Sequence, residues 1–142
     1  MKIILEELKE MTGNTLDEDQ VRMMNPLVLA YIGDTIYDLL VRSYLIMTNT
    51  VTVHNLHNQA IHFVNASAQA HTLEDIFEGL TDEEKTIVRR GRNAKSATVP
   101  KNADIGEYRY ATGFEALLGY LYLTGHTDRL MEIGKWILKS NG

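Results

Sequence analysis

The longest apolar stretch of the chain covers residues 27–46, LVLAYIGDTIYDLLVRSYLI. A helix built from it is apolar around most of its circumference, which predicts a place inside a domain. Asn25 and Pro26 mark its start, because Asn is a favoured N-cap and Pro at the first helical position gives up only an amide without an intrahelical partner. The pattern therefore predicts a central helix that ends near residue 47.

A second nearly all-apolar helix is predicted over residues 110–123, YATGFEALLGYLYL. Glu115 is the only charged residue in that stretch, and Ala116 and Gly119 leave room for a neighbouring helix to approach closely. Shorter patterns predict further helices over residues 2–11, 17–23, 53–71, 73–79 and 82–90 and from residue 127 onward. Because no stretch alternates as a strand would, we expect one all-α domain spanning residues 1–142.

The composition of the chain indicates in which cellular compartment this domain is expected. The chain has no cysteine, which excludes disulfides and thiolate metal sites. Its first residues, MKIILEELKE, reach acids too early for a signal peptide. Residues 43–73 carry no charge but many Thr, Asn, His, Gln and Ser, so they do not resemble a membrane span. We therefore expect a soluble, cytoplasmic protein without a membrane partner.

The polar residues of the first apolar helix fall on one stripe. Asp34, Asp38 and Arg42 are spaced i, i+4 and i+8, so Asp38 is placed to pair with Arg42. Asp34 has no such partner, and an unpaired carboxylate in an apolar run is costly unless a cation neutralises it. Gly33 clears space beside it for another backbone or a ligand. Asp34 is therefore the first candidate for function; the alternative is a solvated or Arg-bound aspartate at the rim of the core.

Glu115 poses the same problem in the second apolar helix. If the two helices cross near their small residues, Asp34 and Glu115 share one site. Two carboxylates without Cys or an HExxH histidine pair favour hard cations such as Mg²⁺ or Mn²⁺. Such a site suits metal-assisted hydrolysis of a phosphodiester.

Positive charge is concentrated in one segment, although the net charge is −5. Residues 85–101 contain six Lys and Arg and no acid, which leaves eight basic residues against nineteen acids elsewhere. Arg89 and Arg90 fit the negative end of the helix dipole. The following residues, 91–108, read as a long basic loop with Arg92, Lys95 and Lys101. This segment is either a footprint for a polyanion or a solvated helix end and loop.

These stretches together resemble a known family. AYIGDTIYDLLV is similar to the signature helix of ribonuclease III, and FEALLGYLYL to its partner helix; with GRNAKS and a following Pro-Lys-Asn between them, the chain resembles the short Mini-ribonuclease III form over essentially its whole length. The resemblance implies an all-α endonuclease domain that forms a homodimer, depends on Mg²⁺ and cleaves double-stranded RNA. It further implies maturation of precursor 23S ribosomal RNA, and leaves room for a ribosomal protein that presents this RNA.

Carried over to this sequence, the resemblance makes Asp34 and Glu115 the catalytic metal ligands. It places Tyr31 at the dimer interface, where ribonuclease III has an aromatic side chain that enters a socket on the other subunit. Full-size ribonuclease III has further acids, which correspond here to Leu27, Ala30 and Thr112, so the number of metal ions stays open. We also expect no separate RNA-binding domain of the family's kind, which would leave Arg92, Lys95 and Lys101 to hold the RNA.

Two other functions remain open from the sequence. The basic loop alone would also suit a non-catalytic RNA-binding or ribosome-assembly module, which would bind RNA without magnesium-dependent cutting. Glu6, Glu7 and Glu10 form a faint acidic helix pattern of an all-α nucleotide pyrophosphohydrolase, although a solvated helix face explains them as well.

Overall fold

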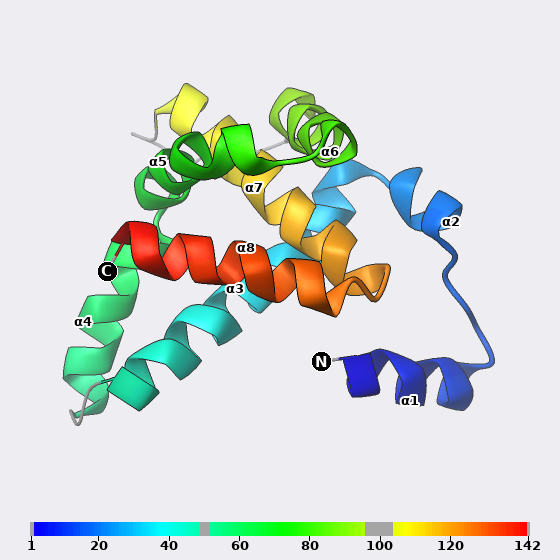
Figure 1. The fold of residues 1–142 in the computed structure, drawn as a ribbon, viewed down its shortest axis with the longest axis horizontal. Coiled ribbons are helices and arrows are strands. Elements are labelled where there is room, and N and C mark those ends of the chain that lie inside the picture. The colour runs from blue at the N-terminus through cyan, green and yellow to red at the C-terminus, as the bar shows by residue number, and fades with distance from the viewer. Residues whose placement is uncertain (1, 49–51, 96–103, 142) are drawn as a thin grey trace.

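The computed structural model describes residues 2–48, 52–95 and 104–141. All regular structure in these ranges is helical, which confirms the predicted all-α class (Figure 1). The elements are α1 (Lys2–Thr12), α2 (Glu18–Arg22), α3 (Pro26–Thr48), α4 (Val53–Val64), α5 (Ala66–Ile76), η1 (Phe77–Gly79), α6 (Asp82–Asn93), α7 (Ile105–Leu123) and α8 (Thr127–Asn141).

Helix α7 is the centre of the domain. It packs against α3, α5 and α6, and α8 also contacts it (Figure 1). From Ala111 to Tyr122, each of its residues except Glu115 is buried. Glu115 is therefore the charged residue in the best-enclosed segment of the described chain.

Helix α3 is less enclosed than its sequence predicts. Its buried side chains face α7 and α4, but Val28, Tyr31, Leu39 and Ile46 are exposed on another face. The expectation of a fully interior helix is therefore only half right, since the described residues leave one apolar face of α3 uncovered.

Local hydrogen bonds explain several helix starts. The Asn25 side chain accepts from the Leu27 amide at 2.9 Å, as expected for the cap of α3. At α6, Thr81 accepts from the Glu84 amide at 3.1 Å while Glu84 accepts from the Thr81 amide at 2.9 Å, which is the predicted capping box. The sequence thus specifies these two starts locally.

Two predicted boundaries were wrong. The helix expected over residues 53–71 breaks at Asn65, whose backbone is extended and whose side chain caps α5 by accepting from the Ala68 amide at 2.8 Å. The loop expected over residues 91–108 is shorter, because α6 continues to Asn93 and α7 begins at Ile105, capped by Asp104 through the Glu107 amide at 2.9 Å.

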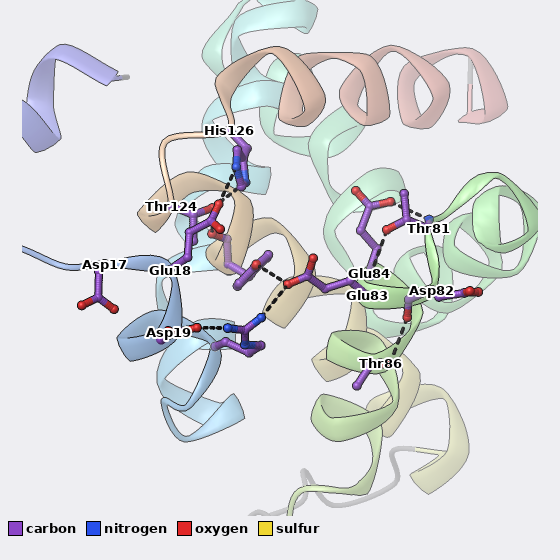
Figure 2. A network of polar contacts seen from close by, with 12 residues as sticks. Asp17, Glu18, Asp19, Thr81, Asp82, Glu83, Glu84, Thr86, Thr124 and His126 are labelled. Carbon is purple, nitrogen blue, oxygen red and sulfur yellow. Dashed lines mark hydrogen bonds and ion pairs between the residues drawn. The ribbon is translucent and has the colours of Figure 1, made fainter.

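Short helix α2 is tied to the body by polar contacts (Figure 2). Arg22 lies 3.4 Å from Glu83 on α6, and the Tyr120 hydroxyl on α7 donates to the same carboxylate at 2.8 Å. His126 lies 2.7 Å from Glu18. Because α3 follows α2 directly in the chain, these contacts also hold the start of α3 near α6 and α7. Among the described helices, none is long and apolar enough to cross a membrane.

Candidate active site

The site is built where α3 and α7 cross with their backbones in contact. A Cβ atom added to Gly33 would lie 1.7 Å from the carbonyl oxygen of Glu115, and one added to Gly119 would lie 1.9 Å from that of Leu29. Real Cβ atoms do not come so close to backbone, so both positions require glycine. The close approach predicted from Gly33 and Gly119 is therefore confirmed, and it places Glu115 beside the residue that precedes Asp34.

The carboxyl groups of Asp34 and Glu115 interact across this crossing. Burial raises the pKa of Glu115 to about 9, and the charge of Asp34, a hydrogen bond shared with Asp34 and the charge of Asp38 act in the same direction. At neutral pH the metal-free protein therefore holds Glu115 mainly as the neutral acid. The structure thus brings together the two acids that the sequence placed on separate helices.

Asp38 also belongs to this electrostatic group, which the sequence analysis missed. It was expected to pair with Arg42, but the described ion pairs include none between them. Partial burial and the charge of Asp34 raise the Asp38 pKa, while Arg42 opposes this shift. Its spacing of one helical turn from Asp34 was the available signal.

The donor set suits a hard divalent cation. Asp34 and Glu115 offer carboxylate oxygens only, and a cation bound between them would replace the proton that Glu115 holds without it. In the described part of the chain, no group of three or more His, Asp or Glu is arranged to hold a metal ion. Thr112, at one of the missing acid positions, is buried and donates to the Tyr108 carbonyl at 3.0 Å.

Tyr31 lies on the uncovered face of α3, with 81% of its surface exposed. Val28, Leu39 and Ile46 share that face. Among the described residues, the core leaves this ring largely uncovered.

The basic residues lie at the end of α6 and differ in what they contact. Arg90 donates to the main-chain carbonyls of Arg22 and Met24, so it fastens the α2–α3 junction rather than its own helix end. The Arg92 guanidinium lies over the Tyr110 ring, 5.8 Å from its centre, and Lys95 is exposed. Lys101 lies outside the described residues. Of the three predicted RNA contacts, the structure therefore describes two, Arg92 inside the end of α6 and Lys95 just after it.

Comparison with known proteins relates this geometry to a family. The Ribonuclease III domain matches residues 27–126, which include both apolar helices and both acids. The chain belongs to the ribonuclease III family. A Mini-ribonuclease 3 of Thermoanaerobacter sp. (strain X514) is 49% identical over 118 residues, 83% of each chain. A Mini-ribonuclease 3 of Clostridium tetani is 46% identical over 131 residues, 92% of this chain and 87% of that protein.

The fold agrees with this assignment. A crystal structure of a Fusobacterium nucleatum protein superposes with a TM-score of 0.76 at 30% identity, and the match covers 86% of this chain and 98% of that one. Family membership identifies the chain as an endoribonuclease of the ribonuclease III type. The resemblance noted in the sequence is therefore confirmed, and the non-catalytic module and the nucleotide pyrophosphohydrolase are set aside.

Proposed function

We propose that this chain is a magnesium-dependent endoribonuclease that cleaves double-stranded RNA with Asp34 and Glu115 as its metal ligands. The observation that carries the proposal is the crossing at Gly33 and Gly119, where the partly buried Glu115 carboxyl meets Asp34. A family of RNA-cutting enzymes and a glutamic acid that gives up its proton more readily to a bound cation point to the same chemistry.

The protein's own groups have distinct parts in this scheme. Asp34 and Glu115 would hold Mg²⁺, or Mn²⁺ in its place, and Glu115 gives up its proton as the cation binds. When bound, the cation supplies activation of water and stabilises charge on the phosphate oxygens. Asp38 adds a negative charge that strengthens the attraction of the site for cations. The apolar walls of α3 and α7 keep the two carboxyls in place.

The same proposal includes a homodimer in which Tyr31 enters the other subunit. A cavity of about 280 Å³ lies between the end of α3 and α4; it is lined by Arg42, Leu45, Ile46, Val53, Leu56, His57 and Ala60. Cavities of roughly half this size hold a benzene ring. A two-fold axis near the middle of α3 would bring Tyr31 of one subunit to the cavity beside Ile46 of its partner, since such an interface pairs each patch with itself.

Substrate binding follows from charge. We propose that the phosphates of the duplex are contacted by Arg92, Lys95 and Lys101, because these residues belong to the basic segment 85–101 of an otherwise acidic chain. The biological substrate proposed from the family is precursor 23S ribosomal RNA in the cytoplasm, with a ribosomal protein as a further partner that presents it.

The acid pair is tested by removing one charge at a time. Asp34→Asn and Glu115→Gln preserve volume, so each variant should keep its helical circular dichroism while cleavage of a long RNA duplex falls by about a thousandfold or more, as expected when several kcal/mol of transition-state stabilisation are lost. The measurement is a gel assay with and without Mg²⁺, with a nucleoside triphosphate as a control substrate. Near-normal cleavage by either variant at saturating Mg²⁺ would remove that residue from the site.

The dimer is tested by removing the exposed ring. Tyr31→Ala should raise the dimer dissociation constant by about 30-fold, the effect of losing a central aromatic anchor, while Tyr31→Phe should keep the dimer. Sedimentation at low micromolar concentration measures this, and Met131→Ala, an exposed change on α8, is the matched control. Equal dissociation constants for Tyr31→Ala and wild type would place the interface elsewhere.

A further inference from the structure

A second cavity, separate from the acid pair, lies between α5, η1, α6 and the first turns of α7. Its volume is about 590 Å³, within the range of small-molecule sites. Leu73 and Val88 form a buried apolar floor, and Phe77 and Tyr110 contribute aromatic rings. Asp34 and Glu115 are not among its lining residues. The volume and the aromatic lining therefore suit a ligand that contains a planar ring.

Two cations of the lining, Arg89 and Arg92, and the neighbouring Lys85 already lie over its aromatic rings. Lys85 is 5.1 Å and Arg89 is 5.9 Å from the centre of Phe77, and Arg92 is 5.8 Å from that of Tyr110. A cationic ligand, such as an arginine side chain of a peptide, would meet these charges and compete with them for the rings. A neutral ring carrying an anionic group instead gains from both the planar guanidinium groups and their charge.

Three carboxylates complete the wall: Glu74, Glu78 and Glu107. None of them takes part in the ion pairs within 4.0 Å that the described residues form. Carboxylates repel phosphate but accept hydrogen bonds from amino groups. Adenine, cytosine and guanine each carry such donors on their edges, whereas uracil has no exocyclic amino group.

We propose that this cavity binds one unpaired nucleobase of the RNA, with its amino edge toward the glutamates and its phosphate toward Arg89 and Arg92. The inference rests on the proposed function and extends it, since Arg92 is also a proposed duplex contact. Tyr110 and Glu115 are five residues apart on α7, roughly 7.5 Å along its axis and about 140° around it, so one RNA strand would pass around α7 to reach both. The enzyme would thus distinguish duplexes with a bulged or overhanging nucleotide from fully paired ones.

The test compares RNA duplexes that differ by one nucleotide. Fluorescence anisotropy competition, without divalent cations so that no RNA is cut, measures binding of a fully paired duplex and of the same duplex with one bulged adenine, cytosine or uracil. Wild type should bind the adenine and cytosine bulges about 5- to 100-fold more tightly than the paired duplex, the range for one stacked base. The uracil bulge should gain less, because it offers the glutamates no amino group.

Tyr110 provides the variant pair. Its ring is 44% exposed, so Tyr110→Ala should fold normally while it removes the preference for bulged RNA, and Tyr110→Phe should retain that preference. Magnesium-dependent turnover of paired duplex that is already bound should be unchanged in both, because Asp34 and Glu115 remain, and this separates the cavity from the proposed catalytic site. Equal affinity of wild type for paired and bulged duplexes would overturn the inference. It would also be overturned if an arginine-rich peptide bound in a Tyr110-dependent manner, because the cavity would then be a peptide site.

Discussion

Helix α7 crosses two helices closely, each time through a pair of glycines, but the charged groups beside the two crossings differ. It crosses α3 through Gly33 and Gly119, and it crosses α6 where Gly91 faces Gly113. The first crossing brings two carboxyls together in a partly buried place. The second has Val88 and Ala116 around it and ends in cations, with Arg92 next to Gly91. A contact between glycines therefore indicates only close helix packing. The candidate catalytic crossing is distinguished by the partly buried Glu115 carboxyl beside its glycines.

The largest expected effect comes from closing the first crossing with a side chain. Gly33→Ala places a Cβ 1.7 Å from the Glu115 carbonyl oxygen, and backbone cannot yield as a flexible side chain would. We expect a loss of at least about 3 kcal/mol in the free energy of unfolding, because both helices must move apart. Chemical denaturation followed by circular dichroism measures it.

Alanine substitutions at two other glycines should destabilise the protein less than Gly33→Ala. Gly113→Ala meets the Val88 carbonyl oxygen at 2.5 Å and should cost less than Gly33→Ala, while Gly134→Ala meets only the end of the Leu40 side chain at 3.0 Å and should cost about 1 kcal/mol or less. If Gly113→Ala were the most destabilising of the three, the α6 crossing rather than the α3 crossing would be the tighter one in solution.

An intermediate effect is expected from three basic residues that follow Gly91 in the sequence. Changing Arg92, Lys95 and Lys101 together to Ala should weaken binding of every duplex sequence and flatten the slope of log affinity against log salt by about one unit per lost phosphate contact. Turnover of RNA already bound should change much less, since Asp34 and Glu115 remain. Filter binding at several salt concentrations measures the slope.

The matched control removes the same charge elsewhere. Lys9, Lys135 and Lys139 lie on α1 and α8, and their joint change to Ala alters the net charge equally. This control should leave the salt slope close to that of wild type. Equal slopes for the two triple variants would show that binding follows overall charge, and the second crossing would then have no special part in holding RNA.

How far the sequence predicted these features depends on how local each one is. The starts of α3 and α6 were predictable because Asn25 and Thr81 cap their helices through residues two and three positions away. The break at Asn65 was missed because an apolar pattern runs through it. The first turn of α7 was missed because Gly106 and its charged neighbours resemble a loop.

The candidate site was predictable for a different reason. A single acid in an apolar helix is conspicuous, so Asp34 and Glu115 stood out, and Gly33 and Gly119 indicated where their helices would meet. Asp38 was misjudged because the local spacing rule offers Arg42 as its partner, whereas its charge also acts on Glu115 from another helix. The cavity beside Tyr110 was not predicted, since it forms only where α7 packs against the consecutive elements α5, η1 and α6.

The last prediction concerns the pH dependence of stability, which should arise at the α3 crossing and not at the α6 crossing. The pKa of Glu115 is raised from 4.5 to about 9 in the folded protein, so between these values the folded state binds more protons than the unfolded state. The stability of the metal-free protein should therefore be highest at low pH within this window and fall as pH rises toward 9. Glu115→Gln removes this titration, and at pH 8 without metal it should be more stable than wild type.

Thermal unfolding in EDTA from pH 5 to pH 9 measures this difference, with Glu7→Gln on the exposed face of α1 as the control. Added Mg²⁺ should raise the melting temperature of wild type but not that of Glu115→Gln, because in wild type the cation takes the place of the proton and binds the folded state. It should also release protons near neutral pH, which calorimetry in two buffers of different ionisation enthalpy detects. A melting temperature of wild type that did not fall with pH would mean that the partly buried Glu115 carboxyl does not lie beside Asp34 in the metal-free protein, and the electrostatic difference between the two crossings would be lost.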